Sequence, residues 1–119
     1  MLPAKTMPDL HKFTNLQVLY LTTTGRVTRL PRTIEIWFIL HDSHLYVFAE
    51  HHHKASWVRN IKEDPSVHIR LGDCDLDGRA RILEPDSDAE LWRTVQDVAR
   101  QKYGWGDGLP VQLAPARLN

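Results

Sequence analysis

The second half of the chain contains two neighbouring segments in which apolar and polar residues alternate strictly. From Ser66 to Leu71 every second residue is apolar, and the residues between them are polar or basic. Leu76–Leu83 repeats this period after a turn at residues 72–75. Alternation with a period of two predicts half-buried β-strands. The two segments therefore predict an antiparallel hairpin with one solvated face, which directs the chain towards folds with an antiparallel sheet.

Four further stretches predict strands, because they are rich in β-branched and aromatic residues and end at turn residues. They are Gln17–Thr24, Thr33–Leu40, His44–Glu50 and Leu109–Leu113, with Pro115 limiting the last one. Helical spacing predicts helices over residues 7–16, 54–62 and 87–103, the last of them opened by a capping box from Ser87 to Glu90. Six short strands interrupted by helices predict a mainly β fold, a small closed β-barrel with flanking helices, rather than a doubly wound sheet.

Composition and charge exclude several broad classes. A length of 119 residues predicts one domain, residues 1–119. The 15 basic and 15 acidic side chains balance to a net charge of zero, which argues against a dedicated nucleic-acid binder. The apolar stretch Ile36–Leu40 is far shorter than the ~20 residues of a membrane span, and the N-terminus lacks the apolar region of a signal peptide. The single cysteine, Cys74, fits a cytoplasmic location.

A cationic turn between the first two predicted strands is the first candidate site. Residues 22–32 combine Arg26, Arg29 and Arg32 with threonines and one glycine. Guanidinium groups bind phosphate or carboxylate through paired hydrogen bonds, and hydroxyls and freed backbone N–H groups add neutral donors. The turn therefore predicts an anion site, and the alternative is a solvated loop whose arginines face water.

A second cationic segment, residues 51–57, follows a predicted strand and begins a predicted helix. A helix N-terminus attracts anions, and Lys54 with the three histidines would strengthen that attraction. A metal site is disfavoured, because consecutive residues of an extended chain point to opposite faces and no regular His or Cys spacing supports zinc. The alternative is again an exposed loop. If the strands are neighbours, both cationic loops converge on one polyanionic ligand.

Aromatic side chains offer a seat for a flat ring, and nucleophile motifs are absent. Trp37, Trp57, Tyr103 and Trp105 could enclose a planar group, whereas core packing is favoured for Phe38. The sequence has no GxSxG, GxGxxG or P-loop motif, and Cys74 lies between two aspartates that disfavour a reactive thiolate.

Three stretches of the sequence carry a resemblance to a known family. They are LTTTGRVTRLPRTIEIWF, LYVFAEHHHKASWVRNIKEDPSVHIRLGD and KYGWGDGLPVQL, and they span most of the chain from about Leu21 to Leu113. The TTTGR…PR turn and the K-x-x-W-x-x-N-[IL]-x-x-[DN]-P-x-V block follow each other at the family's spacing. The chain resembles the deazaflavin (F420)-dependent nitroreductase family, within the pyridoxamine-phosphate-oxidase-like group of FMN-binding split β-barrels.

The resemblance implies a six-stranded split β-barrel and a homodimer with a flavin-type cofactor near the dimer interface. The residues that it assigns to the phosphate-bearing tail of the cofactor are Arg26, Thr28, Arg32, Lys54, Ala55, Ser56 and Trp57. The residues that it assigns to the ring are Ile36, Trp37, Phe38, Glu50 and His51. The chain departs from the family pattern at Val27, Arg29 and His51–His53, which leaves open whether these residues restore positive charge or narrow the groove.

The implied activity is hydride transfer from reduced coenzyme F420 to a small-molecule electron acceptor, either a nitro compound, a quinone or an enone. Such chemistry needs positioning and electrostatics rather than a protein nucleophile. Tyr103 or a water could donate the proton, and Tyr103 could equally be a wall of the site. The alternatives are an FMN enzyme with the same groove, a non-catalytic flavin- or haem-binding module, and an interaction protein with an emptied groove.

Overall fold

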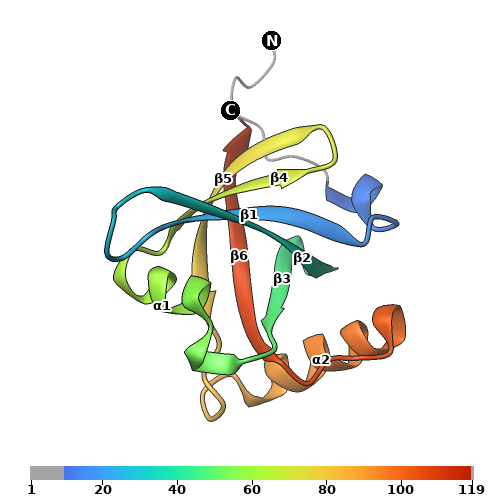
Figure 1. Ribbon diagram of the computed structural model, residues 1–119. Coiled ribbons are helices and arrows are strands. Elements are labelled where there is room, and N and C mark those ends of the chain that lie inside the picture. The colour runs from blue at the N-terminus through green and yellow to red at the C-terminus, as the bar shows by residue number, and fades with distance from the viewer. Residues whose placement is uncertain (1–9, 119) are drawn as a thin grey trace.

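The computed structural model describes residues 10–118. Within them, six antiparallel strands close into a barrel in the order β1-β2-β3-β6-β5-β4 (Figure 1). The strands are β1 Val18–Thr24, β2 Pro31–His41, β3 His44–Ala49, β4 Ser66–Leu71, β5 Cys74–Ile82 and β6 Leu109–Leu118. The helical elements are η1 Leu10–Phe13, η2 His52–Lys54, α1 Ser56–Glu63 and α2 Ala89–Tyr103. The predicted mainly β fold, a closed barrel with flanking helices, is confirmed.

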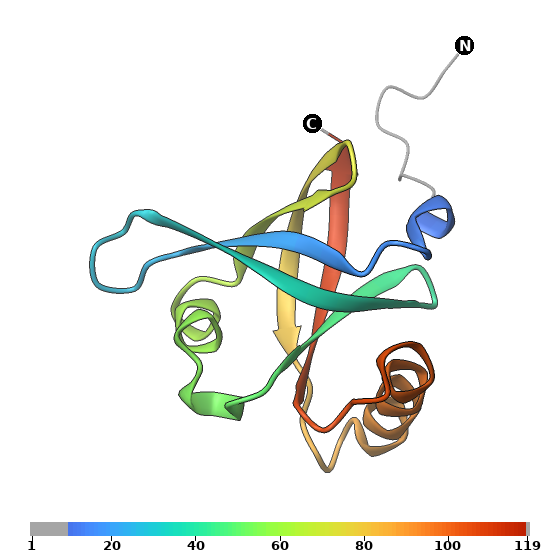
Figure 2. The same cartoon turned by 45° about the vertical axis from the view of Figure 1, so that its right-hand side comes forward.

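Strand β2 changes its partner part of the way along its length. Residues 31–37 pair with β1, where Trp37 lies opposite Val18. From Phe38 onward β2 pairs with β3 instead, and Phe38 lies opposite Val47. Figure 2 shows the two strands diverging from their shared hairpin, because β3 continues alongside β6. Among the described strands, residues 31–37 pair with β1 alone, and their other edge faces the space between β2 and the segment that follows β3.

Apolar side chains from all six strands fill the barrel. In the β4–β5 hairpin, alternate residues point inward as predicted, and Ile69 and Leu76 are fully buried. In β1, Leu19 and Leu21 are buried, while Tyr20 on the other face is 44% exposed. Each fully buried large apolar side chain contributes about 1.5–3 kcal/mol, so this layer holds the strands in register.

The two α-helices flank the barrel on different sides (Figure 2). Helix α1 packs against β1 and β5 and buries Val58 and Ile61, whereas α2 packs against β2 and β6. The short η2 turn leads from β3 into α1 and brings the start of α1 close to β1. Within residues 10–118, no helix is both long and apolar enough to cross a membrane.

Two predictions about element ends are wrong. The capping box from Ser87 does not form, because Asp88 is the N-cap of α2 and its carboxylate accepts hydrogen bonds from the Glu84 amide and from Arg81. Pro115 does not end β6, because a register shift opposite Asp77 and Gly78 accommodates a residue without an N–H donor.

The predicted N-terminal helix, residues 7–16, is also replaced within the described residues. A single 3-10 turn, Leu10–Phe13, occupies this region and buries its two apolar ends, and residues 7–9 lie outside the described part of the chain. Phe13 contributes to the same core as the strands.

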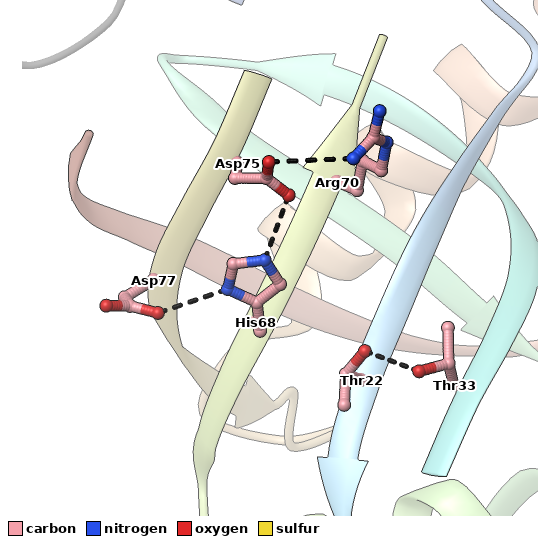
Figure 3. Close-up of polar contacts among 6 residues, drawn as sticks. All are labelled: Thr22, Thr33, His68, Arg70, Asp75 and Asp77. Atoms are coloured by element: carbon pink, nitrogen blue, oxygen red, sulfur yellow. Dashed lines mark hydrogen bonds and ion pairs between the residues drawn. The ribbon is translucent and has the colours of Figure 1, made fainter. Parts of the chain in front are cut away.

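A cluster of charged side chains lies on the outer face of β4 and β5. Figure 3 shows the His68 ring between two carboxylates, 3.1 Å from Asp75 and 3.2 Å from Asp77, with Arg70 also pairing with Asp75. Hydrogen bonds that the His68 ring donates to Asp77, first, and to Asp75 raise the pKa of His68 above its usual value. Asp75 and Asp77 therefore form an ionic cluster with His68 on the surface of the β4–β5 hairpin.

The His68 cluster makes stability depend on pH. Because the folded-state pKa of His68 is raised, its stabilisation is complete below the unfolded-state pKa, about 6.5, and is lost as pH rises through the folded-state pKa. The side chain is 38% exposed, so we expect the loss to stay below about 1 kcal/mol. Denaturant unfolding from about pH 6 to about pH 9 should show that loss, and His68→Gln should flatten it. His53→Gln, in the exposed η2 turn, should leave the pH dependence unchanged.

Candidate functional site

The turn between β1 and β2 is closed tightly around Gly25. The Gly25 amide donates to the Leu30 carbonyl at 2.8 Å, and the Arg29 amide donates back to the Gly25 carbonyl at 2.8 Å. A Cβ atom at position 25 would lie 2.9 Å from the Thr28 hydroxyl and 3.1 Å from the Leu30 carbonyl. The turn therefore leaves no room for a side chain at position 25 and favours glycine there.

Arg26 joins this turn to the start of α1. Its Nη1 donates to the Ser56 carbonyl and hydroxyl, each at 3.2 Å, and to the Asn60 side-chain oxygen at 2.9 Å. Its backbone amide also donates to Asn60, at 3.1 Å. All of these partners are neutral, so they position the guanidinium without cancelling its charge. The two cationic segments of the sequence are thereby brought together, as the sequence predicts.

Asn60 is buried and joins Arg26 to β1, and its role is not evident from the sequence. Its side chain is 3% exposed, accepts both hydrogen bonds from Arg26 and donates to the Thr23 hydroxyl at 3.1 Å. The feature of the sequence that could have identified Asn60 is a polar residue among the buried positions of α1, next to Val58 and Ile61. A buried amide at such a position needs several partners, and here both the turn and β1 supply them.

A groove with cationic walls lies beside this connection, and we call it the cationic groove. It encloses about 320 Å³ between the turn, β2 and the start of α1. Its lining residues are Thr23, Gly25, Arg26, Val27, Thr28, Arg32, Ile34, Ser56, Trp57 and Asn60. Arg32 approaches the Thr28 hydroxyl at 3.4 Å, and no described carboxylate pairs with Arg26 or Arg32. Arg29 is instead 3.9 Å from Asp64 and does not line the groove.

A second cavity, which we call the aromatic hollow, lies further along β2. It encloses about 510 Å³, and its lining residues are Val18, Glu35, Ile36, Trp37, Phe48, Glu50 and Trp105. Ile34 of the cationic groove and Ile36 of the hollow are two residues apart on one strand, roughly 7 Å. Both cavities therefore follow the part of β2 that has separated from β3, and a ligand could contact its open edge.

One wall of the aromatic hollow is held in place by ring stacking. The Trp37 and Tyr103 rings are nearly parallel, at 9°, with their centres 4.5 Å apart. Trp37 remains 44% exposed despite this stacking, and it lines the hollow. Tyr103 thus supports one side of the indole, and the exposed part of Trp37 is a flat surface on which a planar group can lie.

The Tyr103 hydroxyl is committed to the main chain. It lies 2.6 Å from the Gln17 carbonyl and 2.5 Å from the Phe38 carbonyl, and the Phe38 amide donates to it at 3.2 Å. Burial raises its pKa above the usual value for tyrosine. Lys102 also donates to Phe38 and to the Leu16 carbonyl, and desolvation lowers its pKa. The end of α2 therefore fastens β2 where this strand changes partners.

The structure brings most of the expected site residues together. Arg26, Thr28, Arg32, Ser56 and Trp57 line the cationic groove. Ile36, Trp37 and Glu50 line the aromatic hollow, where Trp105 and Glu35 join them.

Four of the residues that the resemblance assigns to the cofactor line neither cavity. They are Phe38, His51, Lys54 and Ala55. The Phe38 side chain belongs to the core at 1% exposure, and Ala55 is the N-cap of α1. His51 and Lys54 are exposed in the turn that leads into α1. No group of three His, Cys, Asp or Glu side chains within residues 10–118 is arranged to hold a metal ion.

The two cavities fit a cofactor that joins a planar ring to an anionic tail. Arg26 uses only Nη1 for its bonds to described residues, so its Nε and Nη2 are directed to no described partner. Together with Arg32 and the Thr28 and Ser56 hydroxyls, these atoms form a donor set suited to phosphate oxygens. The Trp37 surface and the open edge of β2 are suited to a flat ring that carries polar groups.

Comparison with known proteins agrees with this geometry. The model of the F420H2-dependent quinone reductase family matches residues 5–113 of the chain. Among solved structures, the haem storage protein HutZ from Vibrio cholerae is 22% identical with a TM-score of 0.71, and the match covers 87% of this chain and 85% of that one. A putative pyridoxamine 5'-phosphate oxidase from Listeria innocua is 17% identical with a TM-score of 0.65, covering 87% and 86%.

A third solved structure is the F420H2-dependent reductase FDR-A, which is 22% identical with a TM-score of 0.61 and coverage of 83% and 94%. At these identities the likenesses concern the fold alone. They confirm the split β-barrel of the pyridoxamine-phosphate-oxidase type that the sequence resemblance implies.

The Asn60 connection can be tested by stability measurements. Asn60→Ala removes the acceptor of two Arg26 hydrogen bonds and the donor to Thr23, so we expect unfolding to become easier by about 2–4 kcal/mol. Asn60→Asp keeps the oxygen that accepts from Arg26, so its free energy of unfolding should fall less than that of Asn60→Ala. Urea unfolding of the two variants beside the parent chain measures the difference. Equal stability of Asn60→Ala and the parent would show that the connection contributes nothing.

Proposed function

The chain belongs to the F420H2-dependent quinone reductase family, and from this premise we propose that the cationic groove and the aromatic hollow together form its cofactor and acceptor site. As a member of this family it is an F420H2-dependent reductase, an oxidoreductase that acts on a quinone-type acceptor. The observation that carries the proposed site is the junction at Arg26. At this junction Arg26 lies beside Arg32, neither pairs with a described carboxylate, and the aromatic wall at Trp37 lies further along the open edge of β2.

The anionic end of the cofactor is assigned to the cationic groove. Arg26 and Arg32 supply the charge, and the Thr28 and Ser56 hydroxyls supply neutral donors. Arg26 is positioned in advance by Ser56 and Asn60, so binding does not have to order a free side chain. Lys54 remains an expected contact that would require the η2 side chains to turn towards the groove.

The ring of the cofactor is assigned to the boundary between the groove and the hollow. Ile36 and Trp37 provide apolar surface there, and the edge of β2 provides backbone groups. Glu50, just after β3, borders the same space. The acceptor would then lie against the ring within the remainder of the hollow, between Trp37 and Trp105.

When bound, reduced F420 supplies the hydride that reduces the acceptor. The chain contributes binding, orientation and partial exclusion of water, which are the main protein contributions to such reactions. Because the Tyr103 hydroxyl is committed to Gln17 and Phe38, we assign Tyr103 to the support of Trp37 and the acceptor proton to solvent. Tyr103 is therefore a positioning residue in this proposal.

The site is open on one side, which supports a dimer. Tyr20 and Trp37 are each 44% exposed on the outer face near the hollow. A chain of the same fold, 22% identical, is a domain-swapped dimer. We infer a homodimer in which the second copy covers this face and completes the acceptor site.

Turnover and absorbance test the proposed function directly. Purified protein with reduced F420 and menadione should restore the visible absorbance of oxidised F420 faster than the mixture without protein. A panel containing a nitroarene and an enone then defines the acceptor range. Tight binding of FMN with no response to F420 would favour the FMN alternative, and binding of haem without turnover would favour a storage or transport module.

Arginine variants test the assignment of the anionic end. Arg32→Ala should raise the Kd for F420 about 10-fold or more, because a hydrogen bond to a charged group contributes about 1.5–3 kcal/mol. Arg26→Ala should have at least the same effect, since this residue also positions the turn. Calorimetric titration of the cofactor measures both constants. Arg93→Ala, on the exposed face of α2, is the matched control, and equal weakening by all three would contradict the assignment.

A further inference from the structure

We propose that Glu35 and Glu50 give the aromatic hollow a negative charge that selects uncharged or cationic planar acceptors and disfavours anionic ones. This inference rests on the proposed function and specifies its acceptor class. The two residues come to the hollow from different strands, Glu35 from β2 and Glu50 from just after β3. The remaining lining residues of the hollow are apolar or aromatic.

Neither carboxylate is neutralised within the described structure. Glu35 accepts a hydrogen bond from the neutral Tyr20 hydroxyl at 3.2 Å, and no described cation pairs with Glu35 or Glu50. Lys102 is held by the Leu16 and Phe38 carbonyls and does not line the hollow. The histidines that follow Glu50 do not line it either. The charge of both glutamates therefore acts on whatever occupies the hollow.

The two cavities along β2 have opposite charge. The lining of the cationic groove contains Arg26 and Arg32 and no acidic residue, whereas the lining of the hollow contains two glutamates and no basic residue. An anionic acceptor would thus be attracted to the part of the site that we assign to the cofactor tail and repelled from the part beside the ring. A neutral quinone experiences neither effect and is free to lie between the aromatic walls.

Coulomb's law gives the size of the effect. In water-like surroundings, one negative charge in contact with another lowers binding by about fivefold, and two carboxylates lower it by about 25-fold before salt screening. The aromatic surfaces contribute equally to a naphthoquinone and to its sulfonated derivative. The ratio between the two acceptors therefore isolates the contribution of charge.

The test compares a neutral naphthoquinone with a sulfonated naphthoquinone. In the parent protein we expect the ratio of kcat/KM, neutral over sulfonated, to fall as salt is added. In the double variant Glu35→Gln and Glu50→Gln, that ratio should fall by about 5- to 25-fold at low salt. Differences in intrinsic reactivity cancel, because the same two acceptors are used with each protein. Glu84→Gln, an exposed residue outside the hollow, is the control and should leave the ratio unchanged.

Binding provides a readout that is independent of turnover. Quenching of tryptophan fluorescence, to which Trp37 and Trp105 contribute, should report tighter binding of the neutral quinone by the parent protein and a loss of this preference in the double variant. An unchanged ratio in the double variant, or no binding of either quinone, would overturn the inference. Retained binding preference without turnover would overturn the proposed function alone.

Discussion

The change of partner within β2 is the constraint on which the rest of the structure depends. If β2 paired with both β1 and β3 along its whole length, neither of its edges would be open. Here Trp37 is the last residue of β2 paired with β1, and Phe38 is the first paired with β3. The backbone of Phe38 is held at this point by Tyr103 and Lys102 from the end of α2. Both cavities lie along the segment of β2 that this change of partner leaves with an open edge.

The connection at Arg26 converts that open edge into a site with defined chemistry. A cationic turn alone would be a solvated loop, since surface arginines gain little from staying in one place. Asn60 and Ser56 supply neutral oxygen acceptors that fix the guanidinium while its charge stays available. The buried position of Asn60 excludes water from this connection and favours complete hydrogen bonding. Packing of α1 against β1 therefore decides where the cation lies.

The local alternation of apolar and polar residues predicts the strands well, but it does not predict contacts between segments that are distant in the sequence. The alternation from Ser66 to Leu71 predicts a strand with the bounds that the structure shows, because one buried face imposes that period. The end of β6 was mispredicted because the bulge that accommodates Pro115 depends on the opposite strand. Asn60 belongs to the K-x-x-W-x-x-N block and Glu35 lies in an apolar strand, but the sequence does not show their roles, because these arise from partners in other elements. The family resemblance supplied the cofactor, which neither spacing nor composition could have specified.

The zero net charge of the chain conceals a separation of charge within its site. Two arginines and two glutamates line neighbouring cavities along one strand, and composition counts them as cancelling. Their fields do not cancel within each cavity, because the Coulomb interaction weakens with distance and a ligand group lies nearest to the pair that lines its own cavity. A ligand with an anionic tail and an uncharged head is consequently favoured with its tail in the cationic groove and its head towards the hollow, and it is disfavoured in the reverse orientation. In the proposed assignment, this separation of charge orients the cofactor and leaves its ring beside the part of the site best suited to a neutral, flat acceptor.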